Sequence, residues 1–473
     1  MSARKTLFIL CCGLIAASPF LLAQEEIKTG VILDKVVCSQ SPDQSYALYL
    51  PSNYASDRIW PILYALDPGA RGRVAVERFA PAAEKWQVIV AGSNNVRNGP
   101  WEDIITAVLA LREDIRHRFP TDPKQTYVTG FSGGSRAASM FMKITGEPAA
   151  AIIACGAGLA THLSPPDIAP AYYYGLVGNE DFNYQEMRGL EEQLADSGLP
   201  HRLLVFDGPH NWPSEEICGR ALGWVVYRSM AQGSRPKEEK TFQEVFQAEL
   251  EAARALEASG RILQAVKDFE ALLAEFPEPS KPLGLQALVD RWKQSPDWAK
   301  ALKKERSLRQ EENHAVDDRR RFLASIERNP PDPMDFSRML FELGLDGLAK
   351  RAQKSDRPED KALARRLLAG LEIDAREKGF ESYEKRDTGR AVLFFEVAAR
   401  AGDPLLARRW VNFYYLACAH ARAGHVGEAL ANIRKAVANG LTDPGLLEKE
   451  EDFQPFRQHP DFQQILKSLR EKK

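Results

Sequence analysis

The stretch from Gln125 to Ile144, QTYVTGFSGGSRAASMFMKI, decides the fold. Its first five residues are rich in strand-forming side chains, and residues 135–144 have the apolar spacing of a helix. Between them lies a G-x-S-x-G sequence, Gly130 to Gly134, in the position of a strand–turn–helix elbow. Glycines two positions before and after Ser132 let the strand and helix backbones pass closely. We therefore expect the Ser132 hydroxyl at a helix N-terminus, where the dipole favours developing negative charge.

Outward from this turn, residues 31–232 alternate short apolar runs with amphipathic stretches. The expected strands are 31–38, 45–50, 60–66, 87–91, 125–129, 149–154, 172–177 and 202–206, and the first two are joined by a turn at 41–43. The expected helices are 74–86, 101–119, 135–144, 184–196 and 215–230. Strands that alternate with helices predict a mostly parallel sheet covered on both faces.

A serine needs a base to become a strong nucleophile, and the base needs an acid to orient it. In an elbow of this kind, these groups follow the serine in the order acid, then histidine. His210 lies just past the C-terminal end of strand 202–206, at the edge where catalytic groups gather in such sheets. His162 comes too early in the chain, and His201 begins that strand at its other end. We predict His210 as the base.

The acid should follow the preceding strand, 172–177. Asp181 lies there, in the sequence GNEDFNY at 178–184, and we predict it as the acid. Glu180 is the near alternative, and Asp207, three residues before His210, is another. A carboxylate beside His210 stabilises the imidazolium that forms when the histidine takes the serine proton.

Acyl transfer also needs donors for an oxyanion. The N–H of Gly133, the residue after the serine, is the first expected donor. The second should come from the loop after strand 60–66, where Pro68 has no N–H, so that Gly69 or Ala70 must supply it. Loops at the same sheet edge carry the candidates for a substrate pocket: Arg71, Asn94, Asn95 and Trp101.

After the charged stretch 233–240 the strand pattern ends, and residues 241–473 have helical spacing. Three segments place a small residue twelve positions before an alanine and a bulky apolar residue four after it, which suits two helices in close approach. The sets are Ala253, Ala265 and Phe269; Gly379, Ala391 and Phe395; and Ala417, Ala429 and Ile433. These segments resemble tetratricopeptide repeats, with a generic helical bundle as the alternative. Residues 280–370 show no clean repeat.

The N-terminus has the layout of a secretory signal peptide over residues 1–23. Arg4 and Lys5 precede a short apolar run at 7–17, and Ala23 precedes a polar stretch. The run is too short and broken for a membrane span, although an uncleaved anchor is the alternative. We expect an exported protein, periplasmic or secreted, with no stable membrane insertion once the signal is removed.

Composition narrows the protein class. The chain has 473 residues, with 63 basic and 65 acidic side chains, which argues against a nucleic-acid partner. At 44% hydrophobic and 27% charged residues, it is neither mostly disordered nor a polytopic membrane protein. Six cysteines are too few for a disulfide scaffold; those outside the signal peptide are expected as buried thiols, with one disulfide left open. The cysteines and histidines have no metal-ligand spacing and no nucleotide-binding motif follows a strand, which argues against a structural zinc site and against nucleotide binding.

Residues 31–232 resemble an α/β-hydrolase domain, and are similar to secreted esterases of the polyhydroxybutyrate-depolymerase-like and feruloyl-esterase-like kind. The resemblance is carried by YALYLP at 46–51, the elbow at 130–134, the acid loop at 178–184 and the histidine loop at 208–213. It implies a Ser132–His210–Asp181 triad that forms an acyl-enzyme without metal or organic cofactor. The resemblance does not fix the substrate, because related proteins act on esters, peptides or polymers; we expect a small-molecule or polymer ester.

The expected organisation is therefore an α/β domain followed by an all-α domain. The hydrolase domain spans 24–232, a linker 233–240, and the helical repeat domain 241–473, which would bind a protein partner or a polymer. Two other functions stay open. One is a binding or scaffold protein on an inactive hydrolase fold, and the other is an exported serine peptidase on the same fold.

Overall fold

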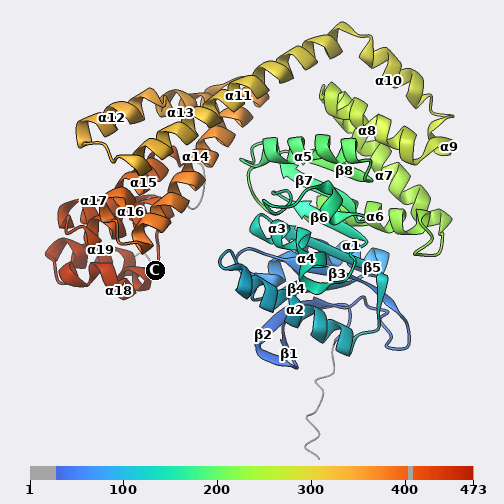
Figure 1. Cartoon of the computed structure of the whole chain (residues 1–473), viewed down its shortest axis with the longest axis horizontal. Helices are drawn as coiled ribbons and strands as arrows, with labels where there is room; N and C mark the ends of the chain where they lie inside the picture. Colours follow the sequence, from blue (N-terminus) through green and yellow to red (C-terminus); the bar gives the residue numbers. More distant parts are fainter. Residues whose placement is uncertain (1–27, 403–408, 472–473) are drawn as a thin grey trace, which may run out of the picture.

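One sheet of eight strands forms the centre of the N-terminal half within the residues that the computed structural model describes, 28–402 and 409–471 (Figure 1). The predicted signal peptide lies outside them. The strand order is β1-β2-β4-β3-β5-β6-β7-β8. The pairs β1–β2 and β2–β4 are antiparallel and the others are parallel. The strands are β1 (Ile32–Cys38), β2 (Ser41–Tyr49), β3 (Trp60–Leu66), β4 (Ile89–Ser93), β5 (Thr121–Phe131), β6 (Ala151–Cys155), β7 (Tyr172–Gly178) and β8 (His201–Phe206).

Helices cover both faces of this sheet. Alternate residues of β3 belong to two different cores, with Leu63 on one face and Ile62 and Tyr64 on the other, as the two-residue period of a strand requires. The first face carries α1 (Gly72–Trp86) and α6 (Glu215–Ala231). The second carries α2 (Trp101–Arg118), α3 (Gly133–Ser139), α4 (Phe141–Thr145), η1 (Pro165–Ile168) and α5 (Tyr184–Ser197). The predicted α/β-hydrolase fold class is confirmed.

Two of the differences between the structure and the expected elements have a clear physical reason. The first turn lies at residues 39–40, not 41–43, because Asp114 accepts hydrogen bonds at 2.7 Å from both the N–H and the hydroxyl of Ser39. Pro42 is tolerated inside β2 because the register with β4 begins only at Tyr46. The single helix expected at 135–144 is divided into α3 and α4 next to Ser139, whose hydroxyl donates to a carbonyl of its own helix.

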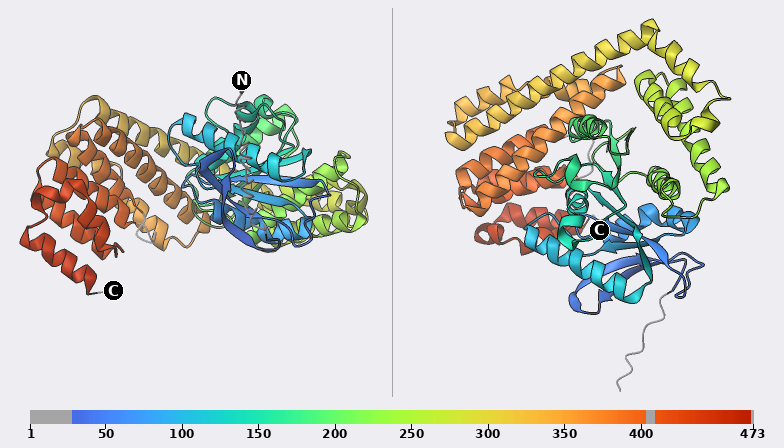
Figure 2. Two further views of the ribbon diagram at one scale, coloured as in Figure 1. Left: turned by 90° about the horizontal axis from the view of Figure 1, so that it is seen from below. Right: turned by 45° about the vertical axis from the view of Figure 1, so that its right-hand side comes forward.

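Beyond α6 the described chain is helical. The helices are α7 (Glu239–Ala258), α8 (Ile262–Glu275), α9 (Pro277–Ser280), α10 (Leu285–Lys293), α11 (Pro296–Arg328), α12 (Pro333–Glu342), α13 (Leu345–Lys354), α14 (Pro358–Glu384), α15 (Thr388–Ala401), α16 (Trp410–Arg422), α17 (Val426–Ala438), α18 (Pro444–Lys449), η2 (Glu451–Phe456) and α19 (Pro460–Arg470). Figures 1 and 2 show that this half starts beside the sheet at α7 and α8 and continues through α10 into the long helix α11, whose side chains bond to α5. It then returns along α14 towards α5.

The three segments with the shared spacing form packed helix pairs: α7 with α8, α14 with α15, and α16 with α17. Their key side chains are buried, and a Cβ added to Gly379 would lie 2.6 Å from the Phe395 ring. The expected close approach of two helices is therefore present, while the assignment to tetratricopeptide repeats stays a prediction. The region without a clean repeat contains α11, a single helix of 33 residues.

Buried ion pairs between arginine and glutamate side chains join the helical half to the sheet. Arg202 on β8 donates to Glu249 on α7 at 2.6 Å and to Glu275 on α8 at 2.7 Å, and Arg220 on α6 also binds Glu249. Burial opposes ionisation of Glu249, yet Arg202 and Arg220 hold the pKa of its carboxyl below the usual value. The pairing therefore keeps this buried carboxylate charged at neutral pH, which fixes α7 against β8 and α6.

Two further features bear on the sequence analysis. Among the helices of the described residues, none combines the length and the apolar character needed to cross a membrane. Cys38, Cys155, Cys218 and Cys418 are buried, and each is a free thiol.

Candidate active site

The elbow at Ser132 has the tight geometry that the sequence predicts. β5 ends at Phe131 and α3 begins at Gly133, and Ser132 between them has φ 52° and ψ −122°, which is uncommon for a residue with a side chain. A Cβ at Gly130 would lie 2.1 Å from the carbonyl oxygen of Gly134. Only glycine at position 130 lets the strand and the helix approach this closely.

Gly130→Ala is expected to lower the free energy of unfolding of the hydrolase domain by about 1–3 kcal/mol, because the added methyl group overlaps backbone atoms. Urea unfolding followed by circular dichroism measures the change. Gly189→Ala is the matched control, since a Cβ at this position in α5 meets no atom within 4 Å. The control should raise stability by about 0.5–1 kcal/mol. Equal stabilities of the two variants would contradict the steric account of the elbow.

The structure brings Ser132, His210 and Asp181 together. His210 Nε2 lies 2.9 Å from Ser132 Oγ, and His210 Nδ1 lies 2.9 and 2.8 Å from the two carboxylate oxygens of Asp181. An ionised carboxylate can only accept, so Nδ1 carries the proton and Nε2 is left as an acceptor for the serine hydroxyl. The Asp181 side chain is 1% exposed and that of His210 is 18% exposed. This arrangement can move the Ser132 proton to His210.

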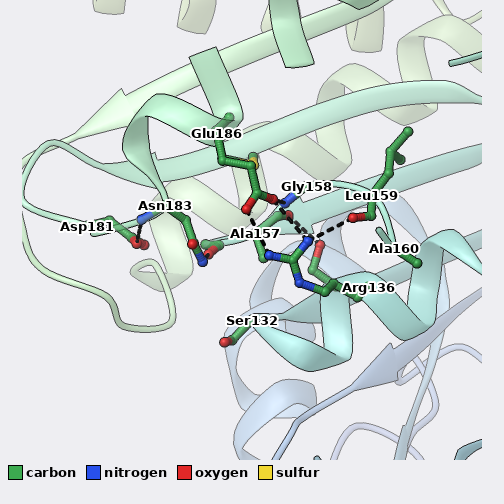
Figure 3. A network of polar contacts seen from close by, with 12 residues as sticks. Ser132, Arg136, Ala157, Gly158, Leu159, Ala160, Asp181, Asn183 and Glu186 are labelled. Atoms are coloured by element: carbon green, nitrogen blue, oxygen red, sulfur yellow. Dashed lines mark hydrogen bonds and ion pairs between the residues drawn. The ribbon is translucent and has the colours of Figure 1, made fainter. Parts of the chain in front are cut away.

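Neighbouring groups hold the histidine and the acid in place. Asp181 accepts the backbone N–H of Asn183 at 2.8 Å, and the Asn183 amide donates to the Gly156 carbonyl oxygen at 2.7 Å (Figure 3). The ring centroids of Phe131 and Phe182 lie 4.6 and 4.3 Å from that of His210. These contacts fix the imidazole plane relative to the carboxylate.

The alternative residues lie in other contacts. Glu180 pairs with Arg365 on α14, and Asp207 accepts from the Asn179 amide and pairs with Arg261. His162 packs against Trp101, with ring centroids 6.4 Å apart. At the other end of β8, His201 Nδ1 lies 2.7 Å from the Leu199 carbonyl oxygen.

The loop after β3 differs from the expectation for the oxyanion donors. The N–H of Gly69 donates to Asp67 Oδ1 at 2.8 Å, and the N–H of Ala70 donates to the carbonyl oxygens of Asp67 and Val96 at 3.2 and 2.9 Å. Both donors are occupied, so neither is free for an oxyanion in this conformation.

Asp67 is the centre of that loop, and the sequence analysis missed it. Its side chain is fully buried and accepts from Arg71 at 2.8 and 2.9 Å and from Trp212 Nε1 at 2.7 Å. It therefore joins the loop after β3 to the histidine loop. The available signal was a carboxylate placed directly after a wholly apolar strand.

Three of the four candidates for the substrate pocket are engaged in hydrogen bonds within the protein, and one is exposed. Arg71 is bound to Asp67. The Asn94 amide donates to the Asp34 carbonyl oxygen, and the Asn95 amide joins the backbone at Ser45, so both hold the β1–β2 hairpin. Trp101 is 37% exposed at the start of α2 and remains available for contact with a substrate.

Asn98 lies beside the elbow, although nothing in its sequence context selects it. Its N–H donates to the Pro68 carbonyl oxygen at 2.9 Å. A Cβ added to Gly133 would lie 1.9 Å from Asn98 Oδ1 and 3.5 Å from Nδ2, so the side-chain amide rests against Gly133. Asn98 lies in a loop rich in Gly and Asn, where exposed polar side chains are common.

An ion pair near Ser132 fixes the loop that follows β6 (Figure 3). Arg136 on α3 and Glu186 on α5 are joined by two hydrogen bonds of 3.1 and 2.8 Å. Arg136 also donates to the Leu159 carbonyl oxygen, and Glu186 accepts the N–H of Gly158. Each of the two charged groups is bound by the other and by the backbone of this loop, so the pair has a structural role: it holds the loop next to Ser132.

One cluster of possible metal ligands occurs among the described residues, away from the elbow in the helical half. It consists of Cys418, Glu450 and Asp452. Glu450 accepts the Tyr414 hydroxyl at 2.5 Å and Asp452 accepts from Arg422 at 3.0 Å. Both carboxylates therefore already have hydrogen-bond partners within the protein, so their proximity does not by itself indicate a metal site.

No protein-family model matches the chain, and no curated protein matches it. Solved structures do. The S-formylglutathione hydrolase of Staphylococcus aureus is 15% identical, with 41% of this chain and 98% of that chain covered and a TM-score of 0.33. A ferulic acid esterase is 15% identical over 42% and 98% of the two chains, with a TM-score of 0.35. Esterase B of Lactobacillus rhamnosis is 12% identical over 43% and 88%, with a TM-score of 0.34. Likenesses at this level assign no activity to this chain.

Proposed function

We propose that the protein is a serine hydrolase that cleaves carboxylic esters through an acyl-enzyme on Ser132. The observation that carries the proposal is the unbroken chain of contacts from Ser132 Oγ through His210 to Asp181, with distances of 2.9 and 2.8 Å. The serine stands at the N-terminus of α3, on a strained turn next to a histidine that can take its proton. A protein that only binds a partner would not require a serine, a histidine and an aspartate within hydrogen-bond distance of one another, so this arrangement favours an active enzyme.

In the proposed reaction, Ser132 Oγ bonds to the ester carbonyl carbon while its proton passes to His210 Nε2. The carbonyl oxygen takes the negative charge, and Asp181 stabilises the imidazolium. When the tetrahedral intermediate collapses, the alcohol leaves with the proton from His210. Water then repeats the sequence on the acyl-enzyme, which releases the acid and restores Ser132.

The oxyanion would be bound by the N–H of Gly133 and the side-chain amide of Asn98. Gly133 is the first residue of α3, so its N–H has no acceptor within that helix. Within the described residues, the Asn98 side chain makes no hydrogen bond, so its Nδ2 can turn towards an oxygen beside Gly133. A side-chain amide performs this task in other hydrolases.

Asn98→Ala is expected to lower kcat for p-nitrophenyl acetate by about 10²-fold and to change KM little, because an oxyanion donor acts mainly in the transition state. Asn95→Ala is the matched control, since that amide binds the β1–β2 hairpin and should leave kcat within about threefold of wild type. If kcat of Asn98→Ala stays at the wild-type value, Asn98 is not an oxyanion donor.

Turnover of paired substrates tests the type of bond that is cleaved. We expect p-nitrophenyl butyrate to be hydrolysed and the matching p-nitroanilide to be left intact. Trp101, which is 37% exposed at the start of α2, offers an apolar surface for a small or polymeric ester. Cleavage of the anilide at a rate equal to that of the ester would instead favour the peptidase alternative.

Export and the role of the helical half are further parts of the proposal. The signal-like segment at 1–23 supports export to the periplasm or the medium. The helical half, with its close-packed helix pairs, would bind a partner protein or a polymer substrate. Measurement of the N-terminus of the secreted protein tests the first point, and cleavage after Ala23 is the expected result.

A further inference from the structure

The loop that carries Asp181 is held from outside the hydrolase domain. Arg366 on α14 donates from Nη1 to the Asn179 carbonyl oxygen at 2.6 Å, and its guanidinium carbon lies 4.5 Å from the centroid of the Tyr184 ring. Asn179 and Tyr184 stand on the two sides of Asp181 in sequence. Arg366 is only 7% exposed, so these contacts are made largely out of water.

Glu312 on α11 fixes the arginine. It accepts from Arg366 Nε at 2.7 Å and from Nη2 at 2.6 Å, and it also accepts from Gln185 in the first turn of α5 at 2.7 Å. Glu312 is 3% exposed. The two-point pairing sets the plane of the guanidinium and leaves Nη1 aimed at the Asn179 carbonyl.

A second contact joins the same loop to the same helix. Arg365, next to Arg366 on α14, pairs with Glu180, the residue before Asp181. Two helices of the C-terminal half therefore contact residues on both sides of the proposed catalytic acid. α14 contacts Asn179, Glu180 and Tyr184, and α11 contacts Gln185. Figure 1 shows α14 approaching the sheet domain on the side where α5 lies.

We propose that Arg366 is a positioning residue that keeps Asp181 in register with His210, so that the helical half completes the active site. This inference rests on the proposed function. The physical reason is that a proton relay tolerates little displacement: a shift of about 1 Å in a catalytic group costs about 10²-fold in rate. Arg366 touches neither the substrate nor the reacting atoms, and acts through the backbone of the acid loop.

Arg366→Lys is the variant of choice. Lysine keeps the positive charge opposite Glu312, but a single ammonium cannot bind both carboxylate oxygens and the Asn179 carbonyl in one plane. We expect kcat for p-nitrophenyl acetate, per active site titrated with a fluorophosphonate, to fall by about 10²-fold, with KM within about threefold. Titration removes any loss that comes from unfolded protein. If the lysine variant folds poorly, Arg366→Gln replaces it, and the same fall in kcat is expected.

A double-mutant cycle with Asp181→Asn separates positioning from general support. If Arg366 acts through Asp181, Arg366→Lys should cause almost no further loss once Asp181 is replaced. Independent, additive losses would overturn the inference.

Arg309→Lys is the matched control. Arg309 joins α11 to Glu192 on α5 by an exposed ion pair, with side chains 44% and 54% exposed, and does not contact the acid loop. Its kcat should match wild type. An unchanged kcat in Arg366→Lys would also overturn the inference while the proposed function stands. A wild type that neither labels nor hydrolyses esters removes the proposed function and the inference with it.

Discussion

Ser132→Ala is expected to abolish ester hydrolysis, with a fall in kcat of more than about 10⁴-fold. The change removes the only hydroxyl oxygen that lies within 2.9 Å of His210 Nε2 among the described residues, and with it the covalent intermediate. The serine hydroxyl acts mainly in the chemical step, so KM should change far less than kcat. Stopped-flow or plate assays with p-nitrophenyl acetate measure both constants.

Ser135→Ala is the control for this loss. Ser135 lies one turn along α3, and its hydroxyl donates to the Ala157 carbonyl oxygen at 2.7 Å without contact to His210. Its replacement should leave kcat within about tenfold of wild type, since it costs one neutral hydrogen bond. Equal activity of Ser132→Ala and wild type would show that another group carries out the reaction.

Asp181→Asn has the second largest expected effect, a fall in kcat of about 10⁴-fold. An amide has nearly the same shape as a carboxylate, but its NH₂ group can donate to His210 Nδ1. That bond would favour the tautomer with the proton on Nε2, which cannot accept the serine proton. The loss of the negative charge also removes the partner of the imidazolium. Steady-state kinetics of the folded variant measures the change.

Asp207→Asn tests the choice of acid. Asp207 is the carboxylate nearest to His210 in sequence, but it binds the Asn179 amide and Arg261 instead. We expect its replacement to keep kcat within about tenfold of wild type. A loss as large as that of Asp181→Asn would move the role of the acid to Asp207.

Local patterns were enough to predict most of the fold. The apolar run Trp60–Leu66 became β3 with the expected limits, because a strand buried on both faces has to be apolar throughout. The order of the partners along the chain was also enough to select Asp181 and His210, because parallel strands bring their C-terminal ends to one edge.

Contacts between distant residues could not be predicted. The donors of Gly69 and Ala70 are occupied in a loop organised by Asp67, which also holds Trp212, 145 residues away. Arg366 reaches Asn179 across 187 residues, and neither residue stands out in its own segment. Nothing in the sequence of α14 links it to the acid loop, because a helical pattern states which face is buried but not against what.

The most direct test of the central claim is intact-mass analysis of the folded protein after reaction with a fluorophosphonate, followed by peptide mapping of the adduct. We predict a single adduct on Ser132, which is absent from Ser132→Ala and forms slowly in His210→Ala. A folded wild-type protein that remains unlabelled, or one labelled at a different serine, would contradict the assignment of Ser132 as an activated nucleophile.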